Sequence, residues 1–248
     1  MPRCQIFTAD EIASLRKGGK ILHGALELTT SLAKPGVTTA ELDRRAEEYI
    51  RDLGAEPGFK GYRGFPATLC TSINEETVHG IPGGRVLREG DLLSIDCGVL
   101  LDDLYTDACI TLSIGPIPPK TQELVDITAE ALARAIERVR PGVRVGDISS
   151  MIQKTVEAKG FSAVRALTGH GLGRDLHQFP DIPNVGEAGT GPHLPAGTII
   201  AIEPIISSGS DAIRESDDGW TIYVQDRALT AHFEHTVLVT PEGYEILT

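Results

Sequence analysis

The chain has 248 residues, enough for one large domain or two small ones. Its composition, 41% apolar and 23% charged, is that of a globular protein, and no apolar run approaches the ~18 residues that a membrane span needs. A net charge of −12 argues against a protein that binds nucleic acid with its whole surface. The chain start has no apolar segment of a secretory signal and the cysteines form no C-x-x-C pair, so we expect reduced thiols and a cytoplasmic location.

Two stretches of similar pattern occur along the chain. Residues 33–55 and 139–161 each begin with a Pro-Gly-Val turn and predict a helix of about four turns that stops at a glycine. A longer amphipathic helix is expected before each stretch, over roughly 9–33 and 119–140. Short strand-like runs follow in both cases, so each half of the chain is predicted to run helix, helix, strands.

This repeated pattern predicts one domain over residues 1–248, built from pseudosymmetric halves of about 8–115 and 116–246. The shared start and the equal spacing to glycine favour an internal duplication, with chance similarity between two amphipathic helices as the alternative. Because the strands come in hairpin-like runs after helices, we expect an α+β fold. Its sheet should be mixed but mainly antiparallel, with helices on one face.

Two aspartates, Asp96 and Asp107, each lie within an apolar run that is typical of a buried strand. The turn-forming sequence Leu-Asp-Asp-Leu between them predicts a hairpin that brings the two runs side by side. Burying a lone carboxylate costs on the order of several kcal/mol, so one must be protonated, or both pair with a base, or both hold a cation. No Arg or Lys lies between residues 89 and 119, which favours a cation but leaves a distant partner open.

The second half adds three ionisable residues in strand-like sequence, namely His170, Glu203 and Glu234. One such residue alone is usually a satisfied structural group, but five in one chain are hard to explain that way. Four carboxylates and one imidazole suit hard or borderline divalent ions such as Mn, Fe, Co or Zn. Since one ion would not balance four negative charges, we expect two ions ~3.5–4 Å apart, bridged by carboxylates and a hydroxide.

The glycine-rich segment GHGLG surrounds His170. A phosphate-binding loop is one interpretation, but the segment lacks the G-x-G-x-x-G order and the GK[ST] ending of such loops. We expect instead that the glycines let the backbone approach the metal pocket closely. The chain also lacks the G-x-S-x-G elbow of one large class of serine hydrolases.

The other histidines carry weaker signals. His79 lies in a turn-rich loop, where a histidine alone is unremarkable. Four further histidines are expected to be structural or at the surface: His23, His193, His232 and His235. Of these, His235 is the least certain because it adjoins Glu234.

Together these residues resemble a known family. The five proposed ligands and the motifs NEETVHGIP, SIDCG, GHGLGRDLH, IEP and EHT are similar to those of type I methionine aminopeptidases, over about residues 8–246. The resemblance implies a pita-bread fold, in which a curved, mainly antiparallel sheet is covered by helices. It also implies an enzyme that removes the initiator methionine when the second residue is small, through attack of a metal-bridging hydroxide on the first peptide bond.

The resemblance assigns a role to each metal ligand. Asp96 would chelate one ion, Asp107 and Glu234 would bridge both, and His170 and Glu203 would hold the other. Two divalent ions are therefore implied, with Co, Mn, Fe and Zn all suited to the ligands.

The resemblance also assigns residues to catalysis and to substrate binding. Glu203 would be the general base, His79 would contact the scissile amide nitrogen, and His177 would contact the oxyanion. Phe59 stands where some members carry Cys and Phe65 where some carry Tyr, and both changes keep an apolar lining. The implied substrate-binding residues are Phe59, Tyr62, Phe65, Cys70, His79, His177 and Trp220.

The implied partners are nascent polypeptide N-termini and the ribosome exit region. Composition and net charge predict no membrane and no direct DNA binding, and we expect a monomer because no oligomerisation stripe is apparent. Docking to the ribosome through residues 207–227 is in doubt, because this loop carries two arginines against five acidic residues. One alternative is an Xaa-Pro aminopeptidase or prolidase-like peptidase, which shares the ligands but normally has an additional N-terminal domain. The other is a non-catalytic pita-bread binding protein, which has typically lost metal ligands.

Overall fold

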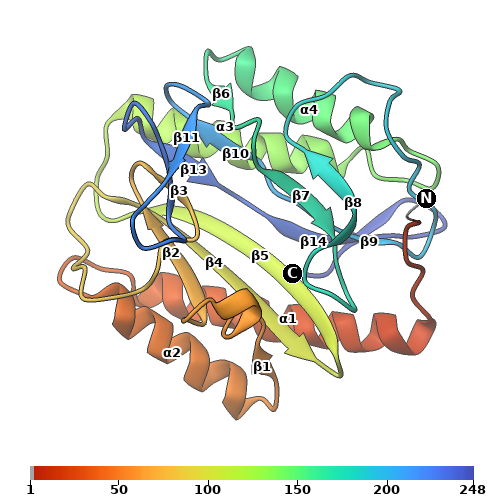
Figure 1. Ribbon diagram of the computed structural model, residues 1–248, viewed down its shortest axis with the longest axis horizontal. Helices are drawn as coiled ribbons and strands as arrows, with labels where there is room; N and C mark the ends of the chain where they lie inside the picture. Colours follow the sequence, from red (N-terminus) through yellow and green to blue (C-terminus); the bar gives the residue numbers. More distant parts are fainter. Residues whose placement is uncertain (1–2) are drawn as a thin grey trace.

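The computed structural model describes residues 3–248 and contains two runs of helices followed by strands (Figure 1). The first run comprises α1 (Ala9–Leu32), α2 (Thr39–Asp52), β1 (Glu56–Pro57), the 3-10 helix η1 (Tyr62–Gly64), β2 (Leu69–Ile73), β3 (Glu76–Val78), β4 (Leu92–Leu101) and β5 (Leu104–Ser113). The second comprises α3 (Pro119–Ile136), α4 (Val145–Glu157), β6 (Ser162–Ala163), β7 (Thr168–Gly171), β8 (Gln178–Pro183), β9 (Ile199–Ile202), β10 (Ile205–Ser207), β11 (Ile213–Glu215), β12 (Ile222–Val224), β13 (Thr230–His232), β14 (His235–Val239) and β15 (Tyr244–Ile246).

The helix boundaries follow local capping chemistry. α1 begins after Thr8, whose hydroxyl accepts a hydrogen bond from the Glu11 amide while the Glu11 carboxylate accepts from the Thr8 amide. The helix predicted over 119–140 ends earlier, at Ile136. Residues 137–138 form a turn and residues 139–140 have no regular structure. The residue directly before Pro141 disfavours the helical conformation, so the helix could not have continued to 140.

Two sheets form the centre of the molecule. The first has the order β1–β4–β2 with β5 paired to β4, and the second has the order β15–β14–β9–β7–β8. Every strand pair within residues 3–248 is antiparallel, so the sheets are not mixed as the sequence had led us to expect. The two sheets meet where the Cys109 amide donates to the Glu234 carbonyl (3.3 Å) and the Glu234 amide donates back (2.9 Å).

Each sheet buries one face against its own pair of helices. Figure 1 shows α1 with α2 and α3 with α4 as separate pairs, with β4, β5 and β14 running between them. In β4 the residues that pack against α1 and α2 alternate along the strand: Leu93, Ile95, Cys97 and Val99. Because successive side chains of a strand point to opposite faces, Asp96 points away from these helices.

Two further expectations concern the whole chain. All four cysteines are free thiols, as expected from their spacing. Within residues 3–248, no helix combines the length and the apolar character needed to cross a bilayer.

Leu93 tests the packing between β4 and the first helix pair. The side chain is fully buried, so Leu93→Ala removes apolar contacts and leaves a cavity. We expect the free energy of unfolding to fall by roughly 2–5 kcal/mol, measured by urea denaturation. Val86→Ala is the control, because Val86 is 45% exposed and should change the unfolding free energy by less than about 0.5 kcal/mol. Equal effects of the two substitutions would contradict this account of the core.

Candidate metal centre and substrate pocket

The β4–β5 hairpin places two carboxylates on the same face of the first sheet. Asp96 lies opposite Cys109, and Asp107 lies opposite Gly98, so the two aspartates are diagonal neighbours across the strand pair. The hairpin turn at Asp102 and Asp103 has positive φ angles of 52° and 60°, the conformation that a tight two-residue connection requires. The predicted hairpin is therefore confirmed, with both aspartates on the face opposite α1 and α2.

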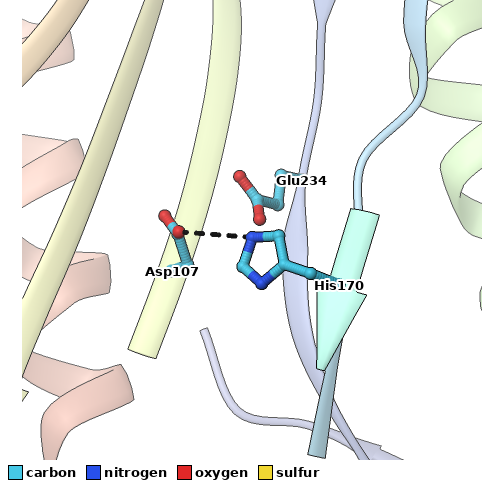
Figure 2. A group of neighbouring side chains, drawn as sticks. All are labelled: Asp107, His170 and Glu234. Atoms are coloured by element: carbon cyan, nitrogen blue, oxygen red, sulfur yellow. Dashed lines mark ion pairs between the residues drawn. The ribbon is translucent and has the colours of Figure 1, made fainter. Parts of the chain in front are cut away.

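The second sheet brings the other predicted ligands to the same place. His170 lies in β7, Glu203 follows the end of β9, and Glu234 precedes β14. The His170 Nε2 atom is 3.9 Å from Asp107 Oδ2 and 3.6 Å from Glu203 Oε1. Figure 2 shows Asp107, His170 and Glu234 pointing toward one another, and one ligand atom from each lies within 4.8 Å of the others. Asp96 lines the same cavity, so all five predicted ligands converge.

The glycines beside His170 have a different role from the one expected. A Cβ atom on Gly169 would lie 2.5 Å from the Ala201 carbonyl oxygen, and one on Gly171 would lie 2.4 Å from the Phe179 carbonyl oxygen. Both close contacts are with the neighbouring strands β9 and β8, not with the metal pocket. The glycines therefore let three strands pack closely and hold the His170 backbone between them.

The carboxylates of this cluster have strongly perturbed pKa values. Burial, followed by the negative charges of neighbouring carboxylates, raises the pKa of Asp107, Glu203 and Glu234 well above the ordinary range. Burial raises the pKa of Asp96 to about 7. The pKa of His170 is lowered to about 3, chiefly by burial, so its imidazole is neutral at pH 7. Without a cation, the cluster reduces its negative charge by holding protons.

The donor atoms fit divalent cations. Three carboxylate oxygens are buried without a hydrogen-bond partner in residues 3–248: Asp96 Oδ1, Asp107 Oδ1 and Glu234 Oε1. In the same part of the chain, the ion pairs of Asp107, Glu203 and Glu234 are with histidines and not with lysine or arginine. Unpaired oxygen donors beside a neutral imidazole nitrogen suit hard or borderline divalent ions.

All five residues of the acidic cluster line a cavity of ≈ 180 Å³. All seven residues predicted to bind substrate line this cavity. Most of its apolar wall comes from one packed group: Phe59, Phe65, Ala67, Cys70 and Leu176, with Tyr62 and Trp220 against it. The residues that line it beyond those predicted are Arg63, Val78, Leu176 and His232.

Ring contacts fix the side chains at the wall of the cavity. Trp220 lies edge-on to Phe65 with ring centroids 5.1 Å apart, and edge-on to His79 at 6.5 Å. His177 bridges the wall and the cluster, since its Nδ1 is 3.2 Å from the Tyr62 hydroxyl and its ring centroid is 4.2 Å from that of His170. His177 therefore contacts both the apolar wall of the cavity and the acidic cluster.

The two histidines predicted to act in catalysis are neutral at pH 7. Burial lowers the pKa of His79. The pKa of His177 is lowered to about 4, first by burial and then by the positive charge of Arg63 and, where His79 is protonated, by repulsion from its ring. A neutral imidazole has one N–H donor and one acceptor nitrogen, so each of these rings can donate a hydrogen bond to a bound substrate.

His232 was expected to be structural or at the surface, and the structure places it in the interior, at the cavity. The residue is 2% exposed, lines the cavity, and has its Nε2 atom 3.7 Å from Glu203 Oε2 and 3.8 Å from Glu234 Oε2. A signal was present in the sequence, because His232 precedes Glu234 by two positions and so shares its face of an extended chain. His235, which adjoins Glu234, instead points to a different groove and pairs with Thr248.

Comparisons with known proteins agree with this geometry. The model of metallopeptidase family M24 matches residues 13–241. The chain is 48% identical to a methionine aminopeptidase of Clostridium perfringens, over 96% of each protein. Its structure is similar to that of a methionine aminopeptidase from Thermotoga maritima, with a TM-score of 0.98, 42% identity and 99% of each chain covered. It also resembles a prolidase from Pyrococcus furiosus, with a TM-score of 0.81 and 25% identity, over 98% of this chain and 65% of that one.

The acidic cluster and the fold define a metal-dependent hydrolase. More specifically, the chain belongs to metallopeptidase family M24. The α+β pita-bread fold that the sequence predicted is thereby confirmed.

Thr236 holds the backbone of Asp107 from the opposite sheet. Its hydroxyl accepts from the Asp107 amide (2.9 Å) and donates to the Asp107 carbonyl (2.7 Å). Thr236→Val should destabilise the protein by about 1–3 kcal/mol, because both backbone groups lose their buried partner. It should also weaken Co²⁺ binding, measured by titration calorimetry, because the backbone of Asp107 is no longer held in place by the hydroxyl. Thr236→Ser keeps the hydroxyl and is the control; identical Co²⁺ affinity in the two variants would refute this link.

Proposed function

We propose that this protein is a methionine aminopeptidase that removes the initiator methionine from nascent proteins when the second residue is small. The observation that carries the proposal is the direct contact, in one cavity, between an acidic metal-ligand cluster and an apolar pocket. The relatives named methionine aminopeptidase support the same activity, since they align with nearly the whole chain. The prolidase is 25% identical to this chain, against 48% and 42% for these two relatives, which makes it the weaker alternative.

Two divalent ions are part of this proposal. Asp96 would chelate one ion, Asp107 and Glu234 would bridge both, and His170 and Glu203 would hold the other. When bound, such ions lower the pKa of a coordinated water from ~15.7 toward ~7 and polarise the substrate carbonyl. Co, Mn, Fe and Zn all suit these donors, so the availability of each metal would decide which is used.

The apolar wall would bind the methionine side chain. Phe59, Phe65 and Cys70 offer a thioether the soft, apolar contacts that it prefers, and Trp220 closes the wall edge-on to Phe65. Burying such a side chain contributes about 1.5–3 kcal/mol of binding free energy. The ion that Asp96 would chelate would also provide a binding site for the free α-amino group, which restricts cleavage to the first residue.

Proton transfers would be carried out by side chains of the cluster. Glu203 would accept a proton from the attacking water and return it to the leaving amine nitrogen. The Tyr62 hydroxyl would donate to His177 Nδ1, which leaves the proton of the neutral ring on Nε2 for donation to the developing oxyanion. His79 would lie toward the scissile amide nitrogen, on the side of the cavity next to Trp220.

The substrates would be N-termini of newly made chains, handled by a monomer. Association with the ribosome exit would use a surface other than the β11–β12 hairpin. The hairpin of β11 and β12 and its flanks carry mainly acidic side chains, which would be repelled by RNA phosphates: Asp211, Glu215, Asp217, Asp218 and Asp226.

Metal removal followed by reconstitution tests the assignment. We expect protein stripped by a chelator to be inactive, and Co²⁺ or another of the four ions to restore release of methionine from Met-Ala-Ser and Met-Pro-Ser. Leu-Ala-Ser should be spared because its branched side chain does not fit the pocket of an enzyme specific for methionine. The measurement is the rate of free amino acid release with each metal added separately.

The peptide panel also separates the alternatives. Cleavage confined to Ala-Pro-Ser and Met-Pro-Ser would identify the Xaa-Pro specificity. Binding of metal with no hydrolysis of any peptide would support a non-catalytic binding protein instead.

Glu203→Gln tests the general base. The amide has nearly the same shape but cannot accept the proton, so we expect kcat to fall by at least about 10²-fold with the fold retained. Metal content must be measured alongside, because Glu203 is also a proposed ligand. A variant loaded with the wild-type amount of metal and retaining full kcat would remove Glu203 from this role.

A further inference from the structure

His232 is a buried histidine whose ring has no hydrogen-bond partner within residues 3–248. Both ring nitrogens are buried and make no hydrogen bond within residues 3–248. A buried N–H group without a hydrogen-bond partner costs roughly 1–3 kcal/mol. Such a ring is therefore expected to lie near a group to which it can donate a hydrogen bond. The ring lines the cavity of the acidic cluster and faces two of its carboxylates, Glu203 and Glu234.

The backbone of His232 is held firmly, so the direction of its ring is built into the fold. Its amide donates to Thr111 Oγ1 (2.9 Å), and its carbonyl accepts from the same hydroxyl group (2.7 Å). The Cys109 thiol also donates to this carbonyl, at 3.5 Å. Both partners belong to β5, the strand of Asp107, and on the other side His232 pairs with Ile205 of β10. The ring therefore projects from a strand that is fixed on two sides.

The two oxygens of Glu203 face two different imidazoles. Oε1 is 3.6 Å from His170 Nε2, and Oε2 is 3.7 Å from His232 Nε2. Glu203 follows the last residue of β9, so strand pairing holds its backbone less firmly than that of Asp107 within β5. A carboxylate in this position needs a side-chain partner to fix its rotation.

We propose that His232 is a positioning residue of the metal centre, whose Nε2–H group donates to Glu203 Oε2 and so fixes Glu203 with Oε1 toward His170. The proposal rests on the ligand role proposed above for Glu203 and deepens it. Closing the gap from 3.7 Å to a charge-assisted hydrogen bond requires a shift of only about 1 Å. Partners of this kind orient metal ligands, and their loss typically weakens metal affinity about 10–100-fold.

A neutral imidazole is suited to this role. It supplies one hydrogen-bond donor without a positive charge, so it orients a carboxylate and leaves the negative charge available to cations. A lysine or arginine in this place would form a buried ion pair with Glu203 and compete with the metal. Glu234 Oε2, at 3.8 Å from the same nitrogen, is the second acceptor within reach.

Co²⁺ binding to the full-length, metal-stripped protein tests the proposal. His232→Leu and His232→Asn remove the donor or withdraw it from reach, whereas His232→Gln keeps an N–H donor near the position of Nε2. We expect the first two to weaken Co²⁺ affinity about 10–100-fold in calorimetry and to shift the visible absorption of the Co²⁺ protein, and His232→Gln to restore both to within about threefold. Among reconstituted variants, kcat should fall more than KM changes in His232→Leu and recover in His232→Gln.

His235→Gln is the matched control, since this neighbouring imidazole lies outside the cavity and should leave Co²⁺ binding unchanged. Wild-type Co²⁺ affinity and spectrum in His232→Leu, or in His232→Asn if the leucine variant does not fold, would overturn the proposal. Paramagnetically shifted N–H proton resonances provide a second check. If the resonance of a second Co²⁺-bound imidazole is lost in His232→Leu and in His232→Asn, His232 is a ligand and not a positioning residue.

These outcomes are distinguishable from failure of the proposed activity. The calorimetric and spectroscopic measurements require no substrate, so they test His232 even if no peptide is hydrolysed. Absence of methionine release from the wild-type protein would remove the aminopeptidase assignment and leave the Co²⁺ result to decide the role of His232.

Discussion

Repulsion among four carboxylates in one cavity is the constraint on which the rest of this structure depends. They come from β4, β5 and the ends of β9 and β14, so no single segment can relieve the repulsion by moving locally. Their raised pKa values express the cost, which is met either by protons or by cations. The helix-facing sides of both sheets, with their buried Leu, Ile and Val residues, provide the stabilisation that offsets this cost.

The junction between the two central sheets and the acidic cluster are the same part of the molecule. Thr236 from the second half holds the Asp107 backbone, and Thr111 from the first half holds His232. The backbones of Cys109 and Glu234 exchange two hydrogen bonds across the junction. Each half therefore positions groups that belong to the other, and a change in how the halves pack would disperse the donor atoms. This coupling explains why threonine hydroxyls occupy buried positions beside the cluster.

The sequence was sufficient for those features that depend on local pattern. The alternation around Asp96 and the turn at 101–104 predicted the hairpin, and charges within apolar strands singled out five residues that line one cavity in the structure. Features that depend on contacts between strands were not predictable in this way. Gly169 and Gly171 were assigned to the metal pocket. The carbonyl oxygens that approach them belong to other strands, and the sequence around the glycines does not reveal those contacts. His232 was overlooked because its partners lie on segments distant in sequence, although its spacing from Glu234 pointed to a shared face.

Neutral histidines supply hydrogen-bonding groups beside the candidate cation ligands without adding positive charge to the cavity. The pKa values of His170 and His232 are lowered to about 3 by burial, so neither ring adds charge at pH 7. Without a cation, the mutual repulsion of the carboxylates favours their protonated forms. A cation that binds to the same oxygens must displace those protons. Affinity for the metal should therefore rise as the pH increases through the raised carboxyl pKa values, because fewer protons then compete for the same oxygens. The histidines do not oppose this exchange, since they are already deprotonated over the whole range.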